Sequence, residues 1–199
     1  MYGEFQIRLA GLFVVSIVLA ATAYGTRAAP VANSPIPALP SPGKFMFQDY
    51  EAPVPASWVA LKPSSNMRAA QYRVPGIGAG AEAELVVFYF GPAQGGGVQA
   101  NIDRWVTQFI SDDGQPVVPR TEHTEVGGLQ VTFVELNGTY ARGIGSGPQG
   151  IAKSNQTLLV AIVETPAGNL TFQLHGDRST VNAHRKSFEA MVRGFGRTT

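Results

Sequence analysis

The chain has 199 residues, with 15 lysine and arginine residues against 14 aspartate and glutamate residues, and it contains no cysteine. Binding to a nucleic-acid backbone needs clustered cations. No run of lysine or arginine occurs, so the charge pattern argues against a nucleic-acid partner. The absence of cysteine excludes disulfides and a lipid attached through a thiol, so a folded domain has to be stabilised by the packing of its core.

Residues 1–23 have the pattern of a secretory signal. Arg8 precedes an apolar run at 9–21, and small residues follow it up to Ala23. This order is typical of a cleaved export signal, and the run is shorter than the roughly 20 residues that cross a bilayer core as a helix. We therefore expect an exported protein, periplasmic or secreted. The alternative is an uncleaved anchor, which would be the chain's one contact with a membrane.

Residues 24–43 are expected to form a disordered, proline-rich linker, with a single domain at 44–199. Five of the sixteen residues at 28–43 are proline, and proline cannot donate to a sheet ladder or continue a helix. The sequence leaves open whether the linker is a tether or a mature N-terminus without a role.

The first half of the domain contains two predicted strands and a helix. Residues 67–74 alternate between apolar and polar side chains, which predicts a half-buried strand. Residues 84–90 are apolar on both faces, as in a strand at the centre of a covered sheet. An amphipathic helix is predicted from apolar residues at helical spacing, which are Val98, Ile102, Trp105, Val106 and Phe109.

The second half contains four predicted strands and a closing helix. Residues 120–126 and 129–136 are separated by Gly127 and Gly128, which predicts a tight hairpin. A glycine-rich loop follows at 142–155, and strands are expected at 157–163 and 170–174. The apolar stripe of the last helix consists of Val181, His184, Phe188, Met191 and Phe195.

This order of elements predicts an α+β fold. Strands precede one helix, and a run of four strands precedes the other, without a strand–helix–strand repeat. The simplest solution is an antiparallel sheet of six or seven strands packed by two amphipathic helices.

The closing unit, residues 170–195 (LTFQLHGDRSTVNAHRKSFEAMVRGF), resembles the C-terminal end of the PsbP-like fold. The segment GPAQGGGVQANIDRW at 91–105 is similar to uncharacterised exported bacterial proteins. The PsbP-like resemblance implies an antiparallel sheet flanked by helices and a non-enzymatic accessory or binding role. It carries no catalytic motif, so no residue role is transferred.

A glycine loop precedes the first predicted helix. Gly95, Gly96 and Gly97 would let several backbone N–H groups approach an anion at the helix N-terminus. The alternative is a connection that needs glycine for its turn. The loop lacks the Gly-Lys-Ser/Thr signature of a nucleotide P-loop.

The candidate metal ligands are His175, Asp177 and His184, near the start of the last helix. No zinc-type spacing occurs, and the alternative for His184 is a core histidine bonded to a backbone carbonyl or to Asp177. A weaker candidate pair is His123 with Glu125, which share a strand face. We expect no cofactor.

Two functions remain open from the sequence. The first is an exported, non-enzymatic accessory or binding domain of the cell envelope, whose partner is an unknown protein or small ligand. The second is a hydrolase or metal-dependent enzyme that uses His175, His184 and Asp177. The two differ in geometry, because the enzyme needs these three side chains in one open pocket. Trp58, beside prolines at the domain start, is either a core residue or an exposed binding aromatic.

Overall fold

The computed structural model describes residues 43–198, apart from 79, 112 and 142–151. The predicted signal at 1–23, nearly all of the linker at 24–43 and most of the glycine-rich loop lie outside the described residues. No helix in the described part of the chain has the length and apolar character needed to span a bilayer.

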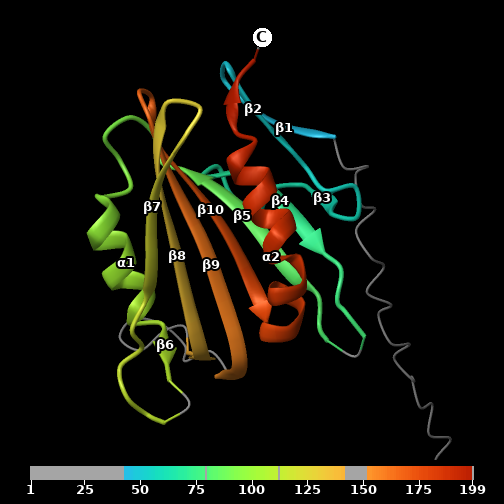
Figure 1. The fold of residues 1–199 in the computed structure, drawn as a ribbon, viewed down its shortest axis with the longest axis vertical. Coiled ribbons are helices and arrows are strands. Elements are labelled where there is room, and N and C mark those ends of the chain that lie inside the picture. The colour runs from blue at the N-terminus through green and yellow to red at the C-terminus, as the bar shows by residue number, and fades with distance from the viewer. Residues whose placement is uncertain (1–42, 79, 112, 142–151, 199) are drawn as a thin grey trace, which may run out of the picture. The chain divides into compact units, whose positions relative to one another are not determined.

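The described residues form an α+β fold whose main sheet is antiparallel throughout (Figure 1). The sheet has eight strands, where the sequence predicted six or seven. Their order is β3-β4-β5-β10-β9-β8-β6, and β7 also pairs with β8. The strands are β3 (Val59–Leu61), β4 (Arg68–Val74), β5 (Ala83–Tyr89), β6 (Phe109–Ile110), β7 (Arg120–Val126), β8 (Leu129–Tyr140), β9 (Lys153–Thr165) and β10 (Gly168–Asp177).

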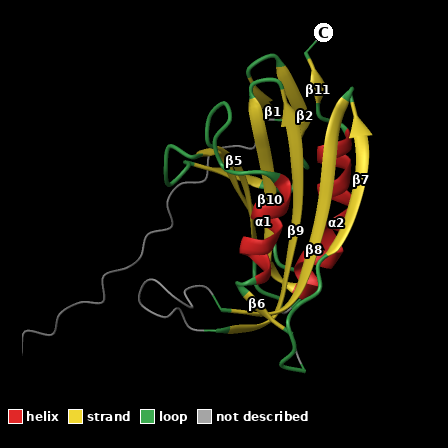
Figure 2. Ribbon diagram, turned by 90° about the vertical axis from the view of Figure 1, so that its left-hand side faces the viewer, coloured by secondary structure: helices red, strands yellow, loops and turns green. Residues whose placement is uncertain are grey.

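The two helices, α1 (Val98–Val106) and α2 (Arg178–Arg193), cover opposite faces of this sheet (Figure 2). On one face, Val181 and Phe188 of α2 share a buried cluster with Phe172 of β10. On the other face, Ile102 and Trp105 of α1 share a cluster with Val160 of β9. Since β9 is covered on both sides, its residues are buried without alternation from Gln156 to Val163.

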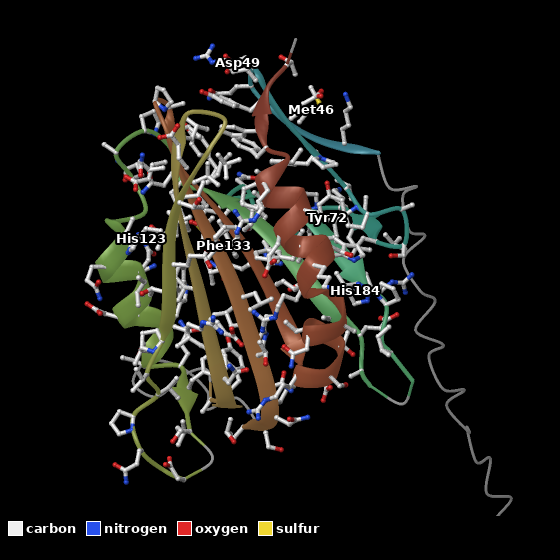
Figure 3. All side chains as sticks on the ribbon, in the orientation of Figure 1. Met46, Asp49, Tyr72, His123, Phe133 and His184 are labelled. Atoms are coloured by element: carbon white, nitrogen blue, oxygen red, sulfur yellow. The ribbon has the colours of Figure 1, made fainter. Side chains whose placement is uncertain are left out.

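A three-stranded sheet, which the sequence did not predict, adds to the α2 side of the core. Its strands are β1 (Lys44–Phe47), β2 (Tyr50–Pro53) and β11 (Gly196–Arg197), in the order β1-β2-β11. The Phe45 ring meets the Phe172 ring edge-on at 5.7 Å, and the Tyr50 ring stacks on the Phe195 ring at 5.2 Å. Asp49, in the turn between β1 and β2, accepts a hydrogen bond from Arg197 at 2.7 Å (Figure 3).

The first helix ends earlier than its apolar stripe predicts. Its C-cap is Thr107, and the N–H of Gln108 bonds to the carbonyl of Trp105. Phe109 then pairs with Tyr140 as part of β6 and is only 4% exposed. The apolar periodicity therefore continued past the helix end because a short strand buries Phe109 in the same cluster as Trp105.

The predicted hairpin at Gly127 and Gly128 is present between β7 and β8. Both glycines have positive φ, 56° and 80°, which suits a two-residue turn between antiparallel strands. The strand predicted at 129–136 is longer in the structure, where β8 continues to Tyr140. This hairpin places β7 beside β8 in one register from Arg120 to Val126.

Candidate functional site

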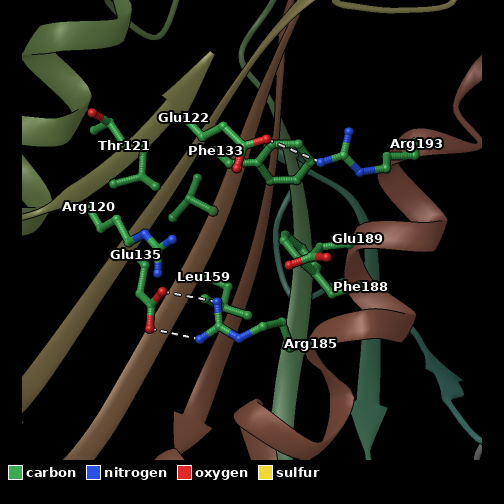
Figure 4. Close-up of a pocket in the computed structure, with 12 residues that line it drawn as sticks. Arg120, Thr121, Glu122, Phe133, Glu135, Leu159, Arg185, Phe188, Glu189 and Arg193 are labelled. Atoms are coloured by element: carbon green, nitrogen blue, oxygen red, sulfur yellow. Dashed lines mark hydrogen bonds and ion pairs between the residues drawn. The ribbon is translucent and has the colours of Figure 1, made fainter. Parts of the chain in front are cut away.

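A hollow of about 380 Å³ lies between α2 and the strands β7 and β8 (Figure 4). It exists because α2 packs mainly on β9 and β10 and leaves part of the face of β7 and β8 uncovered. We call this hollow the α2 pocket. Its lining residues are Arg120, Thr121, Glu122, Phe133, Val134, Glu135, Leu159, Val160, Arg185, Phe188, Glu189 and Arg193.

The floor of the α2 pocket is apolar. Leu159 and Phe188 are 4% and 1% exposed, so they close the pocket toward the core. Phe133 is half-buried and meets the Phe188 ring edge-on at 6.4 Å. A ligand that lies on these side chains would remove apolar surface from water, which favours binding.

One wall of the α2 pocket is made by an ion pair across two elements. Arg185 of α2 donates two hydrogen bonds to the carboxylate of Glu135 in β8, at 2.7 and 3.0 Å. Asn137 donates a third at 2.9 Å, and its own oxygen accepts one from Thr157 at 2.6 Å. This two-point geometry holds both charged side chains in place.

The protonation state of Glu135 follows from these contacts. Burial raises the pKa of its carboxyl group, but the hydrogen bonds from Arg185 and Asn137 and the charges of Arg185 and Arg120 outweigh burial, so the pKa lies below its usual range. Glu135 is therefore a carboxylate at neutral pH.

The other wall is made by Arg193 near the end of α2. Its guanidinium lies 5.3 Å from the centre of the Phe133 ring, a cation–π distance, and 3.3 Å from a carboxylate oxygen of Glu122 in β7. Arg193 thereby links the helix, the floor and the rim of the α2 pocket.

His184, one of the predicted site residues, is a core histidine that faces away from the α2 pocket (Figure 3). The indole Nε1 of Trp58 donates to its Nδ1 at 3.2 Å, and its Nε2 lies 3.0 Å from the carbonyl oxygen of Pro75. An indole N–H can only donate and a carbonyl can only accept, so Nε2 carries the proton. The carbonyl partner is that of Pro75, and Trp58 is fully buried.

His175 lies on the opposite face of the sheet from His184. Its ring packs 4.4 Å from the Tyr140 ring and 6.2 Å from the Phe109 ring, on the α1 side. Burial, and secondarily the charge of Lys153, lowers the pKa of His175 to about 4. Its Nε2 is buried without a hydrogen-bond partner among the described residues.

Asp177 is the N-cap of α2. Its carboxylate accepts hydrogen bonds from the backbone and the side chain of Ser179, at 2.9 and 2.5 Å, and these bonds hold its pKa below the usual range. Asp177 and His175 both border a second hollow of about 440 Å³, but His184 does not. The sheet thus separates the two histidines that the enzyme hypothesis requires in one site.

No group of three or more histidine, aspartate and glutamate side chains in the described ranges could hold a metal ion. The weaker candidate, His123, lies with its Nδ1 3.0 Å from the hydroxyl of Thr132 on the neighbouring strand.

Gly95, Gly96 and Gly97 form the loop that enters α1. Gly95 and Gly96 have φ of 84° and 80°, and a Cβ on Gly95 would lie 2.8 Å from the Phe90 ring. The side-chain amide of Asn101 donates to the carbonyl oxygens of Gly95 and Gly97, at 2.9 and 3.0 Å. These contacts explain the glycines by backbone conformation and close packing. Anion binding at this loop stays a prediction.

The residues of the α2 pocket were missed as a site by the sequence analysis. Arg185 and Arg193 lie outside the apolar stripe predicted for the last helix, and Glu135 falls within the strand predicted at 129–136. A signal was present, because Glu135 follows Leu129, Val131 and Phe133 on one strand face. An acidic residue on an apolar face needs a partner. The identity of that partner, 50 positions away, is set by the fold.

Comparisons with known proteins concern the fold. No protein-family model and no curated protein matches the chain. Among solved structures, it is similar to PA94, a protein of unknown function from Pseudomonas aeruginosa, with 13% identity, a TM-score of 0.45, and 75% of this chain and 92% of that chain covered. It is also similar to cyanobacterial PsbP (CyanoP) from Synechocystis sp. PCC 6803, with 12% identity, a TM-score of 0.49, and coverage of 85% and 100%. The resemblance to the PsbP-like fold is thus confirmed as a weak likeness of fold, and no functional argument rests on it.

Proposed function

We propose that this protein is an exported, non-enzymatic binding domain of the cell envelope and that the α2 pocket is its ligand site. The observation that carries the proposal is the pocket itself, an apolar floor between walls of ion-paired side chains. Hollows of a few hundred Å³ with an apolar lining and a few oriented polar groups are typical of small-molecule sites.

The chemistry of the α2 pocket favours binding over catalysis. A covalent mechanism needs a nucleophile, a base and a group that orients the base. The carboxylate of Glu135 is held by Arg185, with a lowered pKa, and that of Glu122 is paired with Arg193. The lowered pKa of Glu135 makes it a weak general base at neutral pH.

The export part of the proposal rests on the sequence. Residues 1–23 have the order of charge, apolar run and small residues that the secretory machinery reads. A mature protein that lacks cysteine suits an oxidising compartment, because no free thiol is exposed there to oxidation.

The test is native mass spectrometry of the whole chain, purified from the envelope fraction of the cells that export it. A Glu189→Trp variant fills the α2 pocket, since Glu189 lies on the pocket side of α2. A Lys186→Trp variant places the same ring on an exposed part of the helix. We expect a small molecule to remain bound to the wild type and to Lys186→Trp and to be lost from Glu189→Trp.

Two results would contradict the proposal. One is a wild-type protein that carries no small molecule. The other is an adduct of equal mass and occupancy on the filled variant. Circular dichroism and the melting temperature of both tryptophan variants serve as the control for folding.

A further inference from the structure

We infer that the ligand of the α2 pocket is a small zwitterion with an apolar body, of the class of a free amino acid with an aromatic or branched side chain. The inference rests on the proposed function, because it names the chemistry of that same site. It follows from two charged side chains of the α2 pocket, Glu189 and Arg120, that form no hydrogen bond and no ion pair within 4 Å among the described residues.

Glu189 is unpaired although it has two arginines within reach on its own helix. Arg185 and Arg193 lie one turn before it and one turn after it, at the spacing where helical ion pairs form. Arg185 instead bonds to Glu135, and Arg193 to Glu122, both on the sheet. The carboxylate of Glu189 therefore has no hydrogen bond or ion pair within 4 Å among the described residues, and it points into the α2 pocket (Figure 4).

Arg120 is the matching cation on the opposite wall. It lies on β7 directly across from Glu135 in the strand register, and its charge lowers the pKa of that carboxyl group. The hydrogen bonds to Glu135 come from Arg185 and Asn137. The guanidinium N–H donors of Arg120 thus have no acceptor within the described residues, although a guanidinium suits two-point binding of a carboxylate.

The ion-paired side chains add to the separation of charge between Arg120 on one wall of the α2 pocket and Glu189 on the other. Arg120, Glu135 and Arg185 gather at one end of the α2 pocket, with two positive charges against one negative charge (Figure 4). Toward the other end, Glu122 and Glu189 give two negative charges against the single positive charge of Arg193. The pocket is neutral as a whole but dipolar, and a zwitterion matches it better than an ion of either sign.

The apolar floor of the α2 pocket determines the chemistry of the central part of the ligand. The side chain of Leu159 lies between Arg120 and Glu189, and the Phe133 ring lies beside Glu122 and Arg193 (Figure 4). An apolar group of the ligand covers these two apolar side chains, while its anion meets Arg120 and its cation meets Glu189. A fatty acid would leave Glu189 without a cation, and an organic amine would leave Arg120 without an anion.

The test uses L-phenylalanine and two derivatives that each lack one charge. N-Acetyl-L-phenylalanine has no cation, and L-phenylalaninamide has no carboxylate. Each is titrated into the whole ¹⁵N-labelled chain, and chemical shifts of the pocket residues report the dissociation constant. We expect L-phenylalanine to bind about tenfold more tightly than either derivative, because a hydrogen bond to a charged group contributes at about this level.

Two variants assign each charge to its partner. Arg120→Gln weakens L-phenylalanine and the acetyl derivative by about tenfold and leaves the amide unchanged. Glu189→Gln weakens L-phenylalanine and the amide by about tenfold and leaves the acetyl derivative unchanged. Lys186→Gln, which alters an exposed charge on the same helix, changes none of the three. A general loss of structure would weaken all three ligands together and cannot produce this crossed pattern.

The inference is overturned if both derivatives bind as tightly as L-phenylalanine, or if L-phenylalanine perturbs no pocket residue at the limit of its solubility. In either case the proposed function is judged separately by the co-purified molecule. A pocket-dependent adduct of another chemistry, such as a lipid, would leave the binding function intact and refute only the zwitterion.

Discussion

At the scale of single residues, His175 illustrates a polar group whose environment excludes its charged form. Its ring lies between Tyr140 and Phe109, and the carboxylate directly across the strand pair, Glu84, bonds to Gln71 at 2.5 Å. No anion is therefore aimed at His175 from that strand, and the nearby Lys153 opposes its protonation.

This environment predicts a loss of stability in mild acid. The pKa of His175 falls from 6.5 to about 4 in the folded protein, so the unfolded chain binds more protons between these two values. The free energy of unfolding should therefore decrease as the pH falls from 6.5 to 4, by up to about 3 kcal/mol from this residue. Urea denaturation at several pH values measures it.

The matched control is His175→Gln, which keeps a polar side chain but cannot titrate. Carboxyl groups with lowered pKa, such as Glu135, also weaken the fold in acid, and they do so in both proteins. The difference between the two pH profiles isolates the histidine. Parallel profiles over this range would show that His175 is accessible to protons in the folded state.

At the scale of elements, the start of α2 depends on one side chain. Asp177 accepts the backbone N–H of Ser179, one of the N-terminal groups that have no partner within the helix. Asp177→Ala should lower the free energy of unfolding by about 1 kcal/mol. Asp177→Asn should lower it by only a few tenths, since asparagine is an equally good cap. Equal losses in both variants would mean that the charge, rather than the cap, is what stabilises the helix.

The lengths of the helices and strands explain which of them the sequence could predict. The sequence predicted β4 at 67–74 and most of β8 at 129–136, because alternation or apolar character extends over several residues there. The strands β1, β2 and β11 were missed because segments of two to four residues contain no readable period. Phe109 was assigned to a helix because burial alone does not distinguish the end of a helix from a short strand.

The site was less predictable than the fold for a related reason. Its walls pair Glu135 with Arg185 and Glu122 with Arg193, and each pair joins a strand to α2 across a long stretch of sequence. A pattern along the chain shows which residues share a face, but it does not show which residue of another element lies opposite. Only the packing of α2 over β9 and β10 leaves the α2 pocket open.

At the scale of the whole molecule, the two faces of the sheet differ in what packs against them. The α1 side buries a compact cluster that includes Trp105 and Val160. The α2 side contains the larger cluster, the small sheet and, beyond the helix, the α2 pocket. Since α2 bounds the pocket, the contacts that hold this helix to the rest of the chain also determine the geometry of the α2 pocket.

A polar contact of this kind in the core is made by His184, which joins α2 to two distant parts of the chain, Trp58 and Pro75. His184→Ala should lower the free energy of unfolding by about 3 kcal/mol, because it opens a cavity and leaves the buried N–H of Trp58 and the partly buried carbonyl of Pro75 without partners. Trp58→Phe, which removes only the donor, should cost less. The measurement is chemical denaturation of both variants with the wild type. A His184→Ala protein with the stability of the wild type would mean that α2, and with it the α2 pocket, is held in place without the His184 contacts.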